Sequence, residues 1–423
     1  MRPPRSSILI AGAVYLAAMI VIAATETRLG APIYLVCSAV AAAAYLAVLA
    51  VVWRAPDLSH RSAFFLALAL AVAFRVPLAF EPINAGNDMF RYIWDGRVQR
   101  LGYNPYAVLP ADPALASAHP DDNTRLMPSR HSRTPYPPAA QLFFRFVVTV
   151  HDSVGAMKAA LILCDLLTMF ALWRWLLATG RSEWLAVAYA WNPLSVLEVS
   201  HSGHIDALCA LWITVCAYLL ARRRTAWAAA ALALAIATKL LPIVLIPILW
   251  RRIRIRDAFI GVGLIAALSL PFATGSNPFG ALVNVVESTR FNGPLFRAVA
   301  VIGSPRIAAA IAVVLGLLAA IVCRRKLPAD NPAAWAWPMA VALAWAPVIY
   351  PWYLLSMTPF LLVPATLPLI AWTLIVPAVY VVWEIAWAGG RWIVPPAVLV
   401  LEYGSVAAAA LASSWWMRRR RAR

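Results

Sequence analysis

The sequence predicts an all-α membrane protein, a polytopic bundle of transmembrane helices. Of its 423 residues, 63% are hydrophobic and only 13% are charged, whereas about 25% of the residues of a soluble domain are charged. The apolar residues are also gathered into runs, and a helix of roughly 20 apolar residues crosses a bilayer. These two observations exclude an ordinary soluble domain and predict a single integral membrane domain over residues 1–423.

About 13 apolar runs follow one another along the chain and are the predicted membrane segments. They are Ile8–Ala24, Ala31–Trp53, Ala63–Phe80, Ala156–Ala178, Trp184–Leu197, Ile205–Ala221, Trp227–Trp250, Ala258–Thr274, Ile307–Cys323, Ala333–Ile349, Tyr353–Pro364, Leu367–Ala388 and Val394–Trp416. The first run is interpreted as an uncleaved span, because further spans follow it. Two longer polar segments, residues 81–155 and 275–305, are predicted to lie outside the membrane.

Positive charge predicts the orientation of the chain. Its basic clusters are Arg222–Arg224, Arg251–Arg256, Arg324–Lys326 and Arg418–Arg423. All four are cytoplasmic, together with both termini, if Trp227–Trp250 enters and leaves on one side as two half-helices broken near Lys239 and Pro242. About 20 of the 36 Lys and Arg residues then lie in short cytoplasmic loops and tails, as the positive-inside rule expects. The net charge of +18 is therefore assigned to orientation, and nucleic acid is not an expected partner.

The cysteines predict neither a disulfide framework nor a metal centre. All five lie within apolar runs, and none has CxxC spacing. They are interpreted as small buried hydrophobic residues.

The stretch GNDMFRYIWDGRVQRLGYNPY, residues 86–106, predicts a helix in the first outer segment. Asn87 suits the N-cap, Asp88 suits the positive end of the helix dipole, and Gly102 suits the stop. Apolar and polar residues each recur at helical spacing and so form two separate faces of this helix. The apolar face carries Met89, Phe90, Ile93, Trp94, Val98 and Leu101, and the polar face carries Asp88, Arg91, Tyr92, Asp95 and Gln99. We expect an amphipathic helix on the membrane surface with its apolar side down.

Two interpretations of this polar face stay open. One is a structural helix with ion pairs such as Asp88 to Arg91. The other is a carboxylate held at the lipid–water boundary, where it meets a lipid-borne substrate. The segment continues to TPYPP, residues 134–138, which opens a second apolar helix over Ala139–Val150 that is too short to span. A loop this long with helices of its own is more often functional than connective.

Five stretches occurring in order carry a resemblance to a known superfamily. They are NDMFRYIWDGRVQRLGYNPY (87–106), TPYPPAAQLFF (134–144), WNPLSVLEVSHSGHIDAL (191–208), ATKLLPIVLIP (237–247) and YPWYLLSMTPFLL (350–362). With them the chain resembles bacterial polytopic glycosyltransferases of the GT-C superfamily, in particular the glycosyltransferase family 87-like, polyprenyl-phosphate-mannose-dependent mannosyltransferases. Two features depart from the family pattern. Two extra spans precede the first outer loop, and Asn87 stands where relatives often have a second acid.

The resemblance implies an inverting transferase on the outer face of a bacterial plasma membrane. It would move a hexose, with mannose first, from a polyprenyl-phosphate donor to a glycolipid, polysaccharide or protein acceptor. A sugar on a lipid phosphate already has a good leaving group, so one base can suffice, whereas an inverting glycosidase needs an acid and a base. The family places its base where this chain has Asp88. Asp95 is the second candidate, as base, acceptor ligand or helix-fixing partner, and Arg91 and Tyr92 are candidate substrate contacts. No cofactor is expected, and a divalent metal stays open.

Polar residues inside the later motifs are further candidates. His204 and Asp206 open an apolar helix at its outer end. Either Ser202 or Asp206 caps this helix, or His204 and Asp206 contact donor phosphate or acceptor hydroxyls. Their spacing fits no standard metal site. Lys239 lies within a membrane run, where a charge costs about 2.5–3.5 kcal/mol and needs a partner. That partner is either Asp165 or the phosphate of the donor lipid.

The remaining candidates lie near the second outer segment. Arg290 and Arg297 either belong to a solvated loop or cover the acceptor site with an arginine on phosphate. Tyr350, Trp352 and Tyr353 either form an aromatic belt at the membrane surface or stack on sugar or isoprenoid.

Two other functions compete with this prediction. A lipid or sugar-lipid transporter would also carry polar residues inside helices, but it would more naturally show an internal repeat, and the sequence shows none. These motifs also do not distinguish a hexose transferase from a transferase of another lipid-linked sugar, such as aminoarabinose or arabinofuranose.

Overall fold

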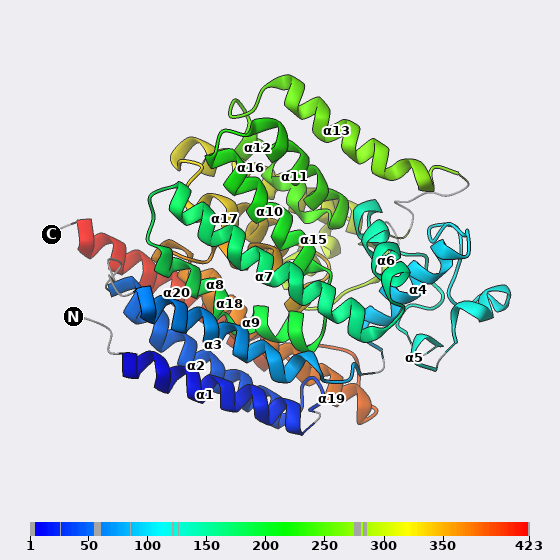
Figure 1. Cartoon of the computed structure of the whole chain (residues 1–423), viewed down its shortest axis with the longest axis horizontal. Helices are drawn as coiled ribbons and strands as arrows, with labels where there is room; N and C mark the ends of the chain where they lie inside the picture. Colours follow the sequence, from blue (N-terminus) through cyan, green and yellow to red (C-terminus); the bar gives the residue numbers. More distant parts are fainter. Residues whose placement is uncertain are drawn as a thin grey trace.

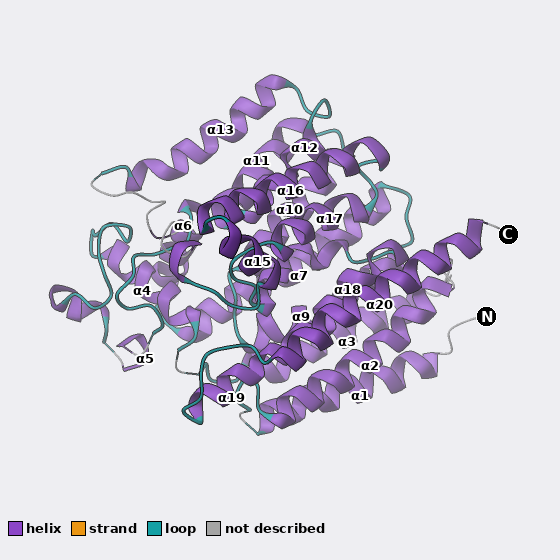
Figure 2. Ribbon diagram, turned by 180° about the vertical axis from the view of Figure 1, so that it is seen from behind, coloured by secondary structure: helices purple, strands orange, loops and turns teal. Residues whose placement is uncertain are grey.

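The computed structural model confirms the all-helical fold (Figure 1). It describes residues 5–25, 27–54, 61–84, 86–120, 122–125, 127–274, 281 and 286–421. Over these residues α-helices, short 3-10 helices and one π-helical turn (η3, Leu197–His201) make up the fold without any β-strand, apart from an isolated bridge between Phe291 and Val348. Figure 2 shows the same helical bundle from behind.

Eight helical stretches within the described chain are long and apolar enough to cross a membrane. They are Ser6–Ala24 in α1, Pro32–Arg54 (α2), Arg61–Ala79 (α3), Val154–Ala178 (α7), Ile255–Phe272 (α13 with η5), Pro305–Lys326 (α16), Pro364–Trp387 (η7 to α19, including α18) and Pro396–Trp416 in α20. Shorter apolar helices are α6 (Pro138–Val150), α10 (Asp206–Ala221), α11 (Thr225–Thr238) and α17 (Pro332–Ala344). A multi-pass membrane protein is therefore confirmed, while the count of about 13 segments stays a prediction.

Two of the predicted runs are not continuous helices. Residues 184–197 are divided among η2 (Glu183–Leu185), α8 (Ala186–Ala190), α9 (Pro193–Val196) and the start of η3 (Leu197–His201). The break falls at Asn192-Pro193, where the asparagine side chain caps α9 and the proline stands at its first position. A proline lacks the N–H that a continuing helix would use. The run 353–364 lies mainly in the 3-10 helix η6 (Pro351–Phe360).

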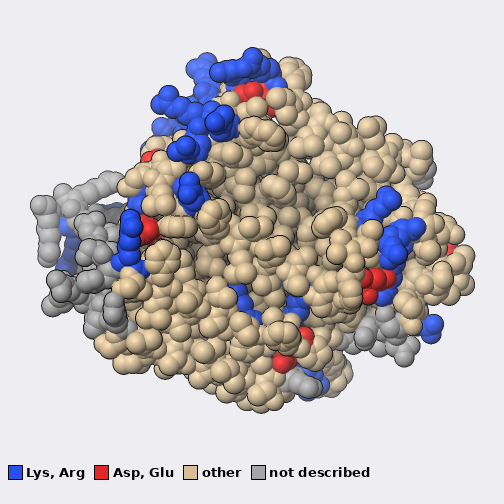
Figure 3. Space-filling model, in the orientation of Figure 1, with Lys and Arg blue, Asp and Glu red and all other residues tan. Residues whose placement is uncertain are grey.

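The long helices run between two ends of the molecule. Both termini lie at one end, and α4 (Asp88–Arg100), α5 (Asp122–Arg125) and α6 lie at the other (Figures 1 and 2). Helices α1, α2 and α3 pack together on one side of the bundle, and α10 packs between α7 and α11. Lys and Arg gather at the end with the termini and above the start of α13, with a smaller mixed group opposite (Figure 3). This distribution agrees with the positive-inside rule, and the orientation itself stays a prediction.

The predicted break inside residues 227–250 is confirmed. Helix α11 ends at Thr238, and Lys239 has an extended backbone with φ −146° and ψ 143°. The chain continues as η4 (Leu241–Leu245), with Pro242 in its first turn, and as α12 (Ile246–Leu249). Because a proline inside a helix lacks the backbone N–H and its ring clashes with the carbonyl four residues earlier, the sequence alone places this interruption within a few residues of Pro242.

The outer helix α4 is also confirmed, but its expected placement is wrong. Asn87 accepts a hydrogen bond from the Met89 amide as the N-cap, and Gly102 follows the helix with φ +87°. The helix does not lie with its apolar side down on lipid. Its apolar residues Phe90, Trp94 and Val98 are covered by a small separate core, to which the following outer segment contributes Leu115, Ala118 and Met127. The other face packs on α6, so α4 is buried on both sides.

Two further expectations about the bundle are resolved. The five cysteines are free and buried, as predicted. Asp165 is not the partner of Lys239, because it is already paired inside the bundle. The Arg75 Nε lies 2.5 Å from Asp165 Oδ2, and the Tyr189 hydroxyl donates to Asp165 Oδ1.

Candidate active site

Side chains from five separate segments meet at the amino end of α4. Asp88, at the first position of the helix, accepts a hydrogen bond from the Tyr136 hydroxyl at 3.1 Å. Lys239, at the break after α11, lies with its Nζ 3.0 Å from Asp206 Oδ2, at the start of α10. The same ammonium lies over the ring of Tyr136 at 5.6 Å and over the ring of Tyr353 at 4.8 Å, measured to the ring centroids. Asp88, Asp206 and Lys239 thus belong to one cluster.

The pKa of Asp88 is raised above the ordinary aspartate value. Burial is the largest cause, since it disfavours the charged carboxylate. The positive charge of Lys239 opposes the shift most strongly, followed by the hydrogen bond from Tyr136. A carboxylate with a raised pKa is the stronger base, which suits a group that takes a proton from a hydroxyl.

A small cavity opens beside Asp88. Its volume is about 50 Å³, and its walls are Leu29, Pro82, Ile83, Asn84, Gly86, Asn87, Asp88, His201, Ser202, His204, Trp352, Trp383 and Trp387. The His204 ring stacks on Trp352 at 4.1 Å with an interplanar angle of 7°. Trp352 stacks in turn on Tyr350 at 4.4 Å. These aromatic residues line the interior of the protein, which favours substrate contact over a belt at the membrane surface.

Asp95 occupies a different environment from Asp88. Its side chain is fully buried and accepts hydrogen bonds from Arg91 Nε at 2.7 Å, Thr134 Oγ1 at 2.6 Å and Gln141 Nε2 at 2.8 Å. Arg91 therefore pairs with Asp95 one turn later, and the expected pair between Arg91 and Asp88 is absent from the ion pairs of the described residues. Since both oxygens of Asp95 are engaged away from the cavity, its position favours the helix-fixing role.

Tyr92 connects α4 to the start of α10. Its hydroxyl accepts from the Ile205 amide at 3.4 Å, and its ring stacks on Phe144 of α6 at 4.6 Å. The expected cap of α10 is not what the structure shows, because the N-cap is Ile205 and makes no side-chain hydrogen bond. Asp206 pairs with Lys239 instead.

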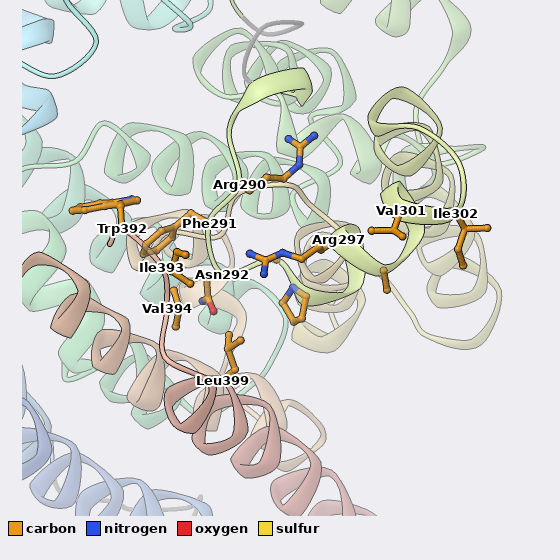
Figure 4. Close-up of a pocket in the computed structure, with 13 residues that line it drawn as sticks. Arg290, Phe291, Asn292, Arg297, Val301, Ile302, Trp392, Ile393, Val394 and Leu399 are labelled. Carbon is orange, nitrogen blue, oxygen red and sulfur yellow. The ribbon is translucent and has the colours of Figure 1, made fainter. Parts of the chain in front are cut away.

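Arg290 and Arg297 line a second, larger cavity of about 650 Å³ (Figure 4). Arg297, from α15 (Pro294–Ile302), points toward Asn292 and Ile393, whereas the Arg290 guanidinium points away from them (Figure 4). Arg290 donates to the carbonyl oxygens of Val286, Glu287 and Thr289. Residues 275–280 and 282–285 of the second outer segment lie outside the described residues.

An aromatic wall separates the two cavities. Phe291 of the larger cavity stacks on Tyr350 at 4.6 Å and meets Trp383 of the smaller cavity edge-on at 5.8 Å. The two arginines therefore do not belong to the Asp88 cluster, although the two sites are neighbours.

Several site residues were missed by sequence reasoning. Tyr136 lies in the TPYPP motif that was already singled out, so a hydroxyl beside the candidate base could have been suspected. Trp383 and Trp387 lie in an apolar helical run and carry no signal that separates them from lipid-facing tryptophans. Glu198 lies inside the WNPLSVLEVSHSGH motif, and a buried acid in a membrane protein is by itself a functional signal.

Metal ligands are not grouped among the described residues. No set of three or more His, Cys, Asp or Glu side chains there is arranged to hold a metal ion. The dependence on a divalent metal stays open.

The fold and the site define a polytopic membrane protein with a half-buried carboxylate, an ammonium and tryptophans around a small cavity, as suits a transferase acting on a sugar. The comparison with protein families agrees. The model of the MptA_B family, described as alpha-(1->6)-mannopyranosyltransferase, N-terminal domain, matches residues 6–253. This is more than half of the chain, which belongs to that family and is therefore a mannosyltransferase-type glycosyltransferase. No curated protein matches the chain.

Proposed function

We propose that the protein transfers mannose from a polyprenyl-phosphate donor to an acceptor hydroxyl, with Asp88 as the base. The observation that carries this proposal is the position of Asp88 in the wall of a tryptophan-lined cavity, beside Lys239 and Tyr136. The family match supports mannose as the sugar. The donor lipid, the outer-face orientation and the inverting course are parts of the proposal.

In the proposed step, Asp88 accepts the proton of the acceptor hydroxyl while that oxygen attacks the anomeric carbon of the donor. The bond between the anomeric carbon and the phosphate oxygen breaks, and its electron pair leaves with polyprenyl phosphate. Because attack and departure occur on opposite faces of the ring, the anomeric configuration inverts. The raised pKa of Asp88 favours the proton transfer, and the phosphate needs no proton to leave.

Cations and apolar surface are both available for the donor. Arg297 faces the larger cavity, whose walls are otherwise mainly apolar, including Val301, Ile302 and Leu399. A guanidinium binds phosphate well, and an apolar wall suits an isoprenoid chain. Lys239 keeps further N–H donors beyond the one directed at Asp206, so it can contact the sugar or the phosphate from the other side of the aromatic wall.

The active site is proposed to face the outside of a bacterial plasma membrane, with both termini in the cytoplasm. This placement rests on the basic clusters of the sequence and on the position of α4 opposite the termini.

The test is sugar transfer by the purified protein in lipid vesicles. Radiolabelled polyprenyl-phosphate mannose and a crude lipid extract would be incubated with the parent, with Asp88→Asn, and with Asp112→Asn as the matched control. Asp112 lies in the same outer segment, exposed and as the N-cap of a short 3-10 helix. Transfer by the parent and the control, without transfer by Asp88→Asn, supports the proposal. Transfer by all three excludes Asp88 as the base, and transfer by none with several sugar donors favours a transporter.

A further inference from the structure

A buried acid and a histidine lie together behind the small cavity. Glu198, in η3, is completely buried and accepts a hydrogen bond from the Tyr380 hydroxyl at 2.7 Å. Its second oxygen, Oε2, lies 3.4 Å from His204 Nε2. His204 is 2% exposed, and its ring is held flat against Trp352.

The backbone between the two residues produces this pairing. The amide of His204 donates to the Glu198 carbonyl at 3.1 Å, which closes a tight turn through Gly203. Gly203 has φ +72°, and a Cβ on it would overlap the Met89 side chain. Only glycine adopts this conformation without strain, so the turn places His204 beside Glu198 and under the first turn of α4.

Polar atoms of this pair lack hydrogen-bond partners within the described chain. They are Glu198 Oε2 and both ring nitrogens of His204. Buried polar atoms are nearly always paired, because leaving them without a partner is costly. His204 is also part of the wall of the small cavity. A ligand in that cavity is therefore the natural partner of at least one of these atoms.

The chemistry of the walls indicates what this ligand is. Trp352, Trp383 and Trp387 offer aromatic faces, on which the C–H face of a pyranose ring packs. Asp88, which lies in the wall, would repel a phosphate. A sugar hydroxyl, by contrast, can donate to a ring nitrogen and to a carboxylate. Because the base must touch the acceptor hydroxyl, the sugar beside Asp88 is the acceptor.

We infer that the acceptor sugar lies at the mouth of the small cavity, against its tryptophans, and inserts one hydroxyl into it. His204 accepts a hydrogen bond from that hydroxyl, and Glu198 is the positioning residue that orients His204. This inference rests on the proposed function. A carboxylate beside Nε2 favours the tautomer with the proton on that nitrogen. Nδ1 is then the acceptor, and Trp352 fixes the plane in which it receives the hydroxyl.

The test separates acceptor binding from donor chemistry. Glu198→Gln and His204→Gln would be compared with the parent and with Glu183→Gln. The control replaces another carboxylate that accepts from an aromatic side chain, Trp173, outside both cavities. Three quantities would be measured. They are the KM for octyl α-D-mannopyranoside as the acceptor, the KM for polyprenyl-phosphate mannose, and the slow release of free mannose when no acceptor is present.

We expect Glu198→Gln and His204→Gln each to raise the acceptor KM by about tenfold or more, as the loss of one good hydrogen bond implies. In both variants the ratio of sugar transfer to release of free mannose falls, whereas Glu183→Gln keeps that ratio and the donor KM at the parent level. The double variant loses little more than either single variant, because the two residues act as a unit. A merely structural role of Glu198 would instead lower transfer and mannose release together, and that result overturns the inference, as does an unchanged acceptor KM.

A binding measurement distinguishes failure of this inference from failure of the proposed function. Octyl α-D-mannopyranoside, kept below its micelle concentration, would be titrated against tryptophan fluorescence. If the parent transfers no sugar, the proposed function fails, and this titration alone then tests whether the small cavity is a sugar-binding site. Binding that is weakened by Glu198→Gln and unaffected by Glu183→Gln supports the acceptor site, and equal binding or no binding by all variants overturns it.

Discussion

At the scale of single residues, two acids of one helix have different environments. Asp95 is surrounded by three hydrogen-bond donors and does not reach a cavity. Within the described part of the chain, Asp88 accepts one hydrogen bond, from Tyr136, and it lies in a cavity wall with a raised pKa. Only the second arrangement leaves a carboxylate oxygen for a substrate hydroxyl.

Replacing the base should abolish most of the activity while leaving the fold intact. We expect Asp88→Asn to lower kcat by about 10² to 10⁴-fold, the usual contribution of a general base. The amide keeps the size of the side chain and still accepts from Tyr136. Initial rates of mannose transfer, normalised to the amount of folded protein, provide the measurement. A loss of less than threefold would contradict this assignment.

The pH dependence should follow the charge of Lys239. Asp88 must be deprotonated to act, and its raised pKa places the acid limb of kcat/KM above the ordinary aspartate range. Because Lys239 lowers the pKa of Asp88, Lys239→Gln should raise that pKa further and move the acid limb to higher pH. Profiles of kcat/KM against pH measure the shift.

Arg100→Gln is the control for this shift. Arg100 lies on the same helix, but its ion-pair partner is Asp152 at 3.8 Å. Its removal should leave the acid limb in place. A limb that moves to lower pH in Lys239→Gln would refute the electrostatic argument.

At the scale of elements, α4 is held in place by polar contacts with α6 and with Thr134, which precedes α6. Asp95 is the centre of these contacts, together with Gln99, which donates to the side chain and backbone of Gln141. Gly96 allows the two helices to approach, since a Cβ there would lie 2.7 Å from the Phe144 carbonyl oxygen. The position of Asp88 therefore depends on the α4–α6 pair.

Removing Asp95 should destabilise this pair without acting on the chemistry directly. Asp95→Ala leaves the guanidinium of Arg91 buried without its partner, and breaking a buried ion pair costs roughly 3–5 kcal/mol. We expect a lower thermal inactivation temperature in detergent. The remaining folded protein should keep a pH profile of the parent shape. If Asp95→Ala were as stable as the parent yet inactive, Asp95 would be the better candidate for the base.

At the scale of the whole molecule, the termini and the outer helices occupy opposite ends (Figure 1). The proposed orientation places Tyr103, after α4, outside the cell and Arg224, before α11, in the cytoplasm. Both residues are exposed, and all five native cysteines are buried. Single cysteines introduced at these two positions can therefore report the orientation.

A membrane-impermeant maleimide should label Tyr103→Cys in intact spheroplasts and Arg224→Cys only after permeabilisation. The parent protein is the control for labelling of its native cysteines, and it should remain unlabelled. Labelling of Arg224→Cys in intact spheroplasts would reverse the topology and place the active site on the cytoplasmic face.

The sequence by itself determined where α4 begins and ends and where the helix after Arg224 breaks, although it did not reveal the breaks within residues 184–197 and 353–364. Asn87, Gly102 and the interruption at Lys239 and Pro242 were predicted at the right places. Caps, glycines and prolines act on the backbone within a few residues, so their effect can be seen locally. The motifs likewise indicated the family. They include Asp88, His204, Asp206 and Lys239, although the sequence did not show that these residues lie close together.

The tertiary structure alone decided which side chains meet. In a membrane helix nearly every position is apolar, so periodicity does not reveal which face turns toward which neighbour. For this reason Asp165 remained a possible partner of Lys239 in the sequence analysis. The sequence also predicted that α4 lies on lipid, whereas the structure places it beneath its own outer segment. It did not show that Arg297 lies apart from the Asp88 cluster. The pairing of Glu198 with His204 depends on a single turn at Gly203, and the cavity beside it depends on tryptophans more than 140 residues further along the chain. Contacts over such separations follow from how the helices cross and rotate, which packing in three dimensions determines.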